Sequence, residues 1–184
     1  EADGPSERTA RFLAALAAWR AGEAESPAEL DAAAREMATR DGRPDVLQVA
    51  AHYRALDAAS RAEGLALEAR YEELRARWVA WDNLAEIGLE PPFEALAVPL
   101  TMELEALLEA ARPALDFAPM ARTEALLARL ILSEPELDAE SGTAESAAGS
   151  ARRARAEELA RQSARRFERG GFVTPRLEPL WLIG

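Results

Sequence analysis

The segment 45–87 constrains the fold more than any other part of the sequence. It contains no proline and a single glycine, Gly64. Its apolar residues recur at alternating steps of four and three, the spacing that keeps side chains on one stripe of a helix: Leu67, Tyr71, Leu74, Trp78, Trp81 and Ala85. A glycine inside a helix costs only about 1 kcal/mol. We therefore expect one long central helix over 45–87, continuous or kinked, with a break at Gly64 as the alternative.

Helical periodicity also marks the segments on either side of this one. The expected helices cover 6–21, 27–41, 101–111, 116–133 and 150–169. The proline-bearing stretch 90–99 is expected to be a stiff connection, with room for one short turn of helix. No run alternates apolar and polar residues with the period of two that a strand requires. The sequence thus predicts an all-α protein, a bundle of about six helices followed by an extended apolar C-terminal tail.

Changes in composition divide the chain into three parts. Residues 1–133 form the expected acidic bundle. Residues 134–150 are small and polar, which is typical of a flexible linker or exposed loop. Residues 151–184 combine an arginine-rich helix with the apolar tail, and we expect this part to pack on the bundle or on a partner.

Charge follows the same division. All 22 basic residues are arginine, and the net charge is −11. The 33 acidic residues concentrate in residues 1–150, whereas the helix and tail after residue 150 carry an excess of arginine. An acidic body repels nucleic acid and acidic membrane surfaces. We therefore expect no nucleic-acid partner and a protein partner instead.

The sequence lacks the residues that several kinds of catalytic and metal-binding site require. The chain has no cysteine and one histidine, His52, so thiolate sites and metal sites built from several histidines are excluded. No glycine-rich phosphate loop with its lysine is present. Paired carboxylates remain open, since such pairs come from distant positions, but no spacing specifies one. We expect no metal, no cofactor and no enzymatic activity.

The arginine-rich helix and the tail are the strongest candidates for a contact surface. On the helix the candidates are Arg161, Arg165 and Arg166. In the tail, large apolar residues would be unfavourable if left in water; the candidates are Phe172, Leu177, Leu180 and Trp181. The tail could fold back over the bundle, enter a groove of a partner, or lead into a membrane anchor if the chain continues past Gly184.

A second hypothesis places a small molecule between helices. Tyr71, Trp78 and Trp81 lie on one helical stripe and could line a cavity, although aromatic residues at this spacing usually belong to the core. The first hypothesis is thus a non-catalytic interaction protein, namely a subunit, assembly factor or adaptor. The alternative is an extracytoplasmic sensor or ligand-binding domain. The start at Glu1, without methionine, weakly favours a periplasmic or secreted protein. The oligomeric state is left open.

Overall fold

The computed structural model describes residues 4–23, 27–89, 91–133 and 143–169, the last from residue 149 onward with side chains. Within these ranges the regular structure is entirely helical, which confirms the predicted all-α bundle. The helices are α1 (Pro5–Ala21), α2 (Pro27–Arg40), α3 (Asp45–Ala55), α4 (Ala58–Glu86), α5 (Phe93–Ala111), α6 (Phe117–Leu132) and α7 (Thr143–Arg169). α4 is the longest of them, with 29 residues.

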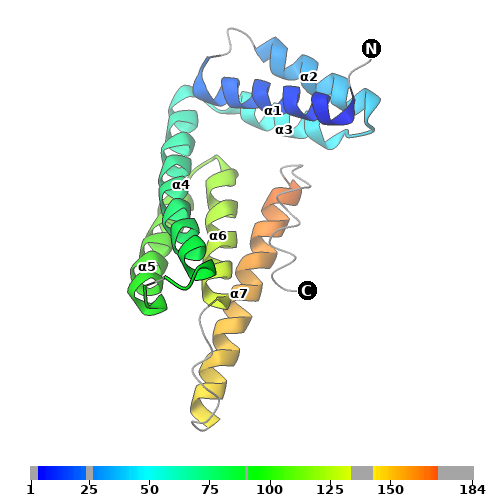
Figure 1. The fold of residues 1–184 in the computed structure, drawn as a ribbon. Helices are drawn as coiled ribbons and strands as arrows, with labels where there is room; N and C mark the ends of the chain where they lie inside the picture. The colour runs from blue at the N-terminus through cyan, green and yellow to red at the C-terminus, as the bar shows by residue number, and fades with distance from the viewer. Residues whose placement is uncertain (1–3, 24–26, 90, 134–142, 170–184) are drawn as a thin grey trace.

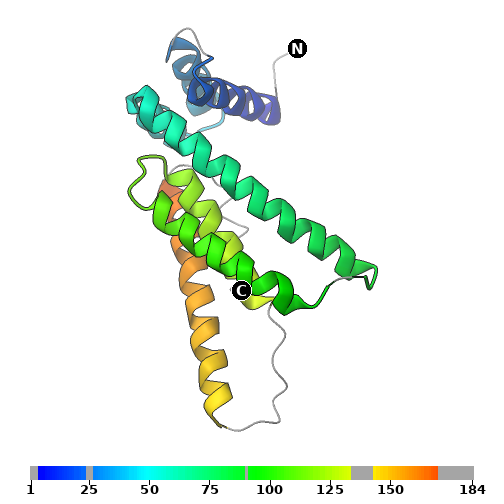
Figure 2. The ribbon, with the colours of Figure 1, turned by 90° about the vertical axis from the view of Figure 1, so that its left-hand side faces the viewer.

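The helices form two groups, each with its own apolar core. Figures 1 and 2 show α1, α2 and α3 packed together at the N-terminal end of α4. α5 and α6 pack against α4, and α7 packs against α6. The N-terminal core includes Phe12, Leu30, Met37, Val49 and Tyr53. The second core is built from α4 to α7 and includes Leu74, Trp78, Leu104, Leu127 and Leu130.

The predicted helix over 45–87 is interrupted, and the interruption is not at Gly64. α3 ends at Ala55, Leu56 is extended with φ −70° and ψ 131°, and α4 begins at Ala58. Asp57 caps α4 by accepting a hydrogen bond of 2.7 Å from the backbone N–H of Ser60. Leu56 is buried in the N-terminal core. The continuous helix and the break at Gly64 are therefore both wrong, because capping by Asp57 outweighs the flexibility of the glycine.

Two other boundaries differ from those expected. α5 begins at Phe93 and runs through Pro99, although we expected a connection there and a helix from Thr101. α7 begins at Thr143, so part of the predicted linker 134–150 is helical; residues 134–142 lie outside the described residues. Helix propensity in these alanine-rich stretches offsets the signals of proline and of small polar residues.

α6 lies at the centre of the second group. It packs against α4, α5 and α7, and ten of its 16 residues are buried. Among the described helices, α7 packs closely on α6 alone. The segment 117–132 therefore holds the second core together, a role that we had assigned to 45–87.

Because Leu127 is fully buried on α6, the substitution Leu127→Ala should lower the free energy of unfolding by about 2–5 kcal/mol. The matched control is Leu84→Ala on α4, where the leucine is 39% exposed and the loss should stay below about 1 kcal/mol. Urea unfolding followed by circular dichroism measures both. Equal losses in the two variants would contradict the central position of α6.

Candidate functional site

Asp116 is the centre of a buried polar cluster between the two groups of helices. It precedes α6 and caps it by accepting a hydrogen bond of 3.1 Å from the backbone N–H of Ala118. The same carboxylate oxygen accepts a hydrogen bond of 3.1 Å from the hydroxyl of Tyr53 on α3. The other oxygen accepts a hydrogen bond from Arg20 on α1. One fully buried carboxylate thus joins α1 and α3 to α6.

Arg20 extends the cluster to α4. Its Nη1 atom lies 2.7 Å from Oε2 of Glu68 on α4. The other carboxylate oxygen of Glu68, Oε1, lies 2.7 Å from Nη1 of Arg122 on α6. Burial opposes the charge of Arg20, but the carboxylates of Asp116 and Glu68 outweigh it, so the pKa of Arg20 is raised. Burial, reinforced by Asp116, raises the pKa of Tyr53. The phenol therefore stays protonated and donates its hydrogen bond.

Gly64 permits this arrangement. The residue is buried within α4, and a Cβ atom placed on it would lie 2.6 Å from an oxygen of Asp116 and 2.7 Å from its Cβ. Both distances are shorter than van der Waals contact allows. The glycine that we considered as a helix break is instead the place where the Asp116 side chain packs against the backbone of α4.

The cluster connects helices through ion pairs. The carboxylates of Asp116 and Glu68 are both paired with arginine, so neither is free to act as a base. His52 stands nearby, with its ring 5.4 Å from that of Phe117 and 5.1 Å from that of Tyr53. Its Nε2 atom is buried and has no hydrogen-bond partner.

A second polar contact fixes α7 on α6. The Nε atom of Arg166 donates to both oxygens of Glu124, at 3.0 Å each, and Glu124 is only 2% exposed. The hydroxyl of Ser163 donates to the carbonyl oxygen of Ala121 at 2.7 Å. Burial raises the pKa of Glu124, and Arg166 only partly counteracts it. These bonds set the register of α7 along α6.

The three arginines predicted as partner contacts do not share one role. Arg166 faces inward and holds Glu124. Arg161 and Arg165 are exposed; Arg161 pairs with Glu157 at 2.9 Å, whereas Arg165 has no ion pair with any described residue. Positive side chains near the C-terminal end of a helix are also favourable because they interact with the helix dipole. The predicted tail contacts Phe172, Leu177, Leu180 and Trp181 lie outside the described residues.

The three aromatic residues predicted to line a ligand cavity belong to the second core or pack against it. Trp78 is 2% exposed and Tyr71 9% exposed. The ring of Trp81 stacks on that of Trp78 at 5.3 Å, and its Nε1 atom donates to the carbonyl of Pro91 at 3.0 Å. A ligand there would have to displace these contacts. The Nε1 atom of Trp78 is buried without a partner.

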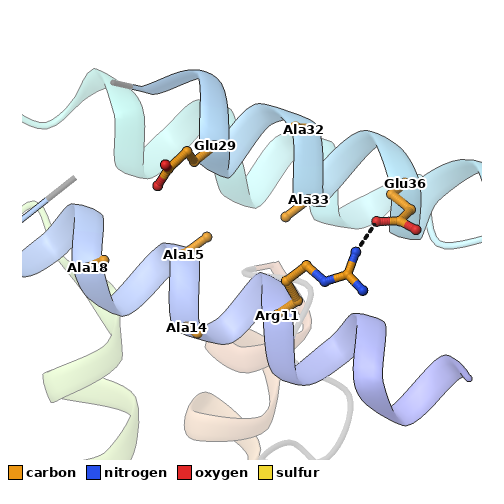
Figure 3. A pocket seen from close by; sticks show the side chains of 8 residues that line it. All are labelled: Arg11, Ala14, Ala15, Ala18, Glu29, Ala32, Ala33 and Glu36. Carbon is orange, nitrogen blue, oxygen red and sulfur yellow. Dashed lines mark hydrogen bonds and ion pairs between the residues drawn. The ribbon is translucent and has the colours of Figure 1, made fainter. Parts of the chain in front are cut away.

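A hollow of about 510 Å³ lies elsewhere, along the seam between α1 and α2. Figure 3 shows alanines of both helices along it, among them Ala15 and Ala33, with the ion pair of Arg11 and Glu36 at one end and Glu29 nearer the other. Alanine side chains are too short to fill the space between the helices. The hollow therefore follows from composition and holds no converging set of reactive groups.

Neither a membrane span nor a metal centre is found in the part of the chain that the structure describes. None of its helices combines the length and apolar character needed to cross a bilayer. Its histidine, aspartate and glutamate side chains form no group of three or more suited to holding a metal ion. Sequence reasoning did not find the Asp116 cluster, for which the only local signals are the capping position of Asp116 and the glycine within α4.

Comparisons of the chain with protein-family models, with curated proteins and with solved structures found no match in any of the three. The function must therefore be argued from the residues and their contacts.

Two glycines within helices provide a matched test of the Asp116 cluster. We expect Gly64→Ala to destabilise the protein by about 1–3 kcal/mol, because overpacking forces Asp116 away from α4. Gly149→Ala on α7, where a Cβ atom meets nothing within 4 Å, should instead stabilise by up to about 1 kcal/mol through helix propensity. Urea denaturation measures both. A stabilising Gly64→Ala would show that the close approach of Asp116 does not exist.

The pKa of Glu124 gives a prediction with a definite sign. Because the pKa is raised in the folded protein above its ordinary value of 4.5, ionisation of Glu124 opposes folding, and its contribution is most unfavourable above the folded pKa. Glu124→Gln should therefore be as stable as the parent protein or more stable at pH 7, with the advantage disappearing below about pH 4.5. Urea midpoints measured between pH 4 and pH 8 test this. A Glu124→Gln variant that loses stability at pH 7 would show that the ion pair with Arg166 outweighs burial.

Proposed function

We propose that this chain is a non-catalytic helical interaction protein, a subunit, assembly factor or adaptor, which binds an acidic protein partner through the outer face of α7 and the apolar tail. The observation that supports the proposal most directly is Arg165. Elsewhere in the described chain most arginines are paired with carboxylates, as Arg122 and Arg155 are. Arg165 is exposed and has no carboxylate partner among the described residues. It lies on α7, whose inner face is attached to α6.

The attachment of α7 suits a contact surface. Ser163 and Arg166 anchor the inner face to α6, so the outer face is presented on a rigid element. Arg161 and Arg165 are four residues apart and lie on the same side of the helix. A partner with two neighbouring carboxylates would neutralise both, and exchange of the surface pair between Arg161 and Glu157 costs little.

The tail supplies the apolar component that charge alone lacks. Protein interfaces obtain most of their affinity from a few buried aromatic and aliphatic side chains surrounded by polar ones. Residues 172–183 contain Phe172 and Trp181 together with several leucines, directly after the arginine-bearing end of α7. We propose that these residues enter a groove of the same partner.

The double variant Arg161→Glu/Arg165→Glu tests the proposal. A tagged parent protein should recover its partner from an extract of the source cells, and the double variant should lose at least about tenfold of that recovery, because charge reversal replaces attraction by repulsion. Arg166 is left unchanged, since its partner Glu124 is buried. Recovery is quantified by mass spectrometry, with circular dichroism confirming an unchanged helical signal.

Arg75→Glu is the matched control. Arg75 is an exposed arginine of α4 in a surface pair with Glu72 at 3.1 Å, and its reversal should leave recovery intact. A second arm ends the chain after Gly171 and should also abolish recovery. Recovery that survives both the double variant and the shortened chain would refute the proposal.

A further inference from the structure

Helix α5 has exposed apolar residues in addition to its buried apolar face. Its inner residues Leu100, Leu104 and Leu107 are buried in the second core. Val98 is nevertheless 59% exposed and Met102 66% exposed. A helix that only packs against one core needs polar residues on its opposite face. The outer face of α5 is therefore not explained by the fold.

The exposed residues of this face form one continuous stripe. Ala95, Val98, Pro99, Met102 and Ala106 are all exposed. Their spacing of three, one, three and four places them along one side of the helix. In Figure 2 α5 faces the viewer, and no described helix lies across it. We call these five residues the outer stripe of α5.

Pro99 adds a polar feature to the outer stripe. Proline has no backbone N–H, so it cannot donate to the carbonyl of Ala95, four residues earlier. Ala95 is itself exposed. The stripe thus combines apolar side chains with a carbonyl oxygen that lacks its usual helical donor.

All charged residues on α5 are glutamates, and several lie next to the outer stripe. Glu94 is exposed and has no ion pair with any described residue. Glu105 and Glu109 each have an arginine partner, Arg155 and Arg112 respectively, in pairs that are at least 40% exposed on both sides. Exposed pairs of this kind contribute little stability and exchange partners readily.

We propose that the outer stripe of α5 is a docking site for an amphipathic helix of a partner protein, with apolar residues on Val98 and Met102 and basic residues beside Glu94 and Glu105. Amphipathic helices bind apolar surfaces through anchors spaced by three and four residues. Methionine is common on surfaces that receive such helices, because its side chain adapts to the partner.

A second copy of the chain fits the stripe less well than a basic helix does. Two outer stripes placed face to face would bring Glu94, Glu105 and Glu109 of both copies together, and like charges across a contact are unfavourable. The site is also separate from the α7 surface proposed above. Its residues differ, so the two proposals can fail independently.

The test uses a defined probe, a labelled 18-residue peptide with leucine at helical spacing and lysine on both flanks, titrated into the full-length protein at ~0.15 M salt. We expect binding by fluorescence anisotropy, and no binding of the same peptide with glutamate in place of lysine. Val98→Thr/Met102→Gln should weaken binding of the lysine peptide at least tenfold, because apolar anchors carry most of the affinity. Leu47→Gln, at a leucine of α3 that is 41% exposed, is the matched control and should bind as the parent does.

Three results would overturn the proposal. One is equal binding by the parent and the double variant, which would mean attraction to the acidic body in general. Another is an equal loss in the Leu47→Gln control. The third is self-association of the parent in sedimentation velocity that Val98→Thr/Met102→Gln removes, since the stripe would then be a contact between two copies. Circular dichroism of both variants confirms that the fold is kept.

Discussion

The buried carboxylate of Asp116 is the interaction on which the arrangement of this molecule depends. It caps α6, accepts the hydroxyl of Tyr53 and binds Arg20, so one side chain connects three elements. A buried charge is tolerated only when it is paired and hydrogen-bonded. Removing any one of these partners would leave another buried group unsatisfied. The close approach that requires Gly64 is a direct result of this geometry.

Arginine has two different uses in the chain, and composition alone does not separate them. Some arginines connect helices through carboxylates, as Arg122 does between α6 and α4 and Arg166 between α7 and α6. Others, such as Arg165, are exposed and have no such pair within the described residues. The same residue type therefore stabilises the bundle and supplies the proposed contact surface. Only the position of each guanidinium group distinguishes the two roles.

Periodicity predicted the helical class and the inner face of α4, because apolar spacing follows directly from burial on one side of a helix. It did not predict the end of α3 at Ala55, where capping by Asp57 and burial of Leu56 decide the boundary. Nor could it predict that Arg20, Tyr53 and Asp116 meet, since contacts between distant segments depend on how the helices cross. Glu124 resembled a surface residue in the sequence, but α7 covers it.

The extended residue Leu56 has a consequence for cooperativity. Because the chain leaves helical geometry there, α1 to α3 and α4 to α7 keep separate hydrophobic cores. Among the described residues, the links between the two groups are the polar cluster, the packing of Phe117 against the N-terminal core, and the guanidinium of Arg61 over the ring of Trp19. Cooperation between the two groups therefore depends on these few contacts rather than on one shared hydrophobic core.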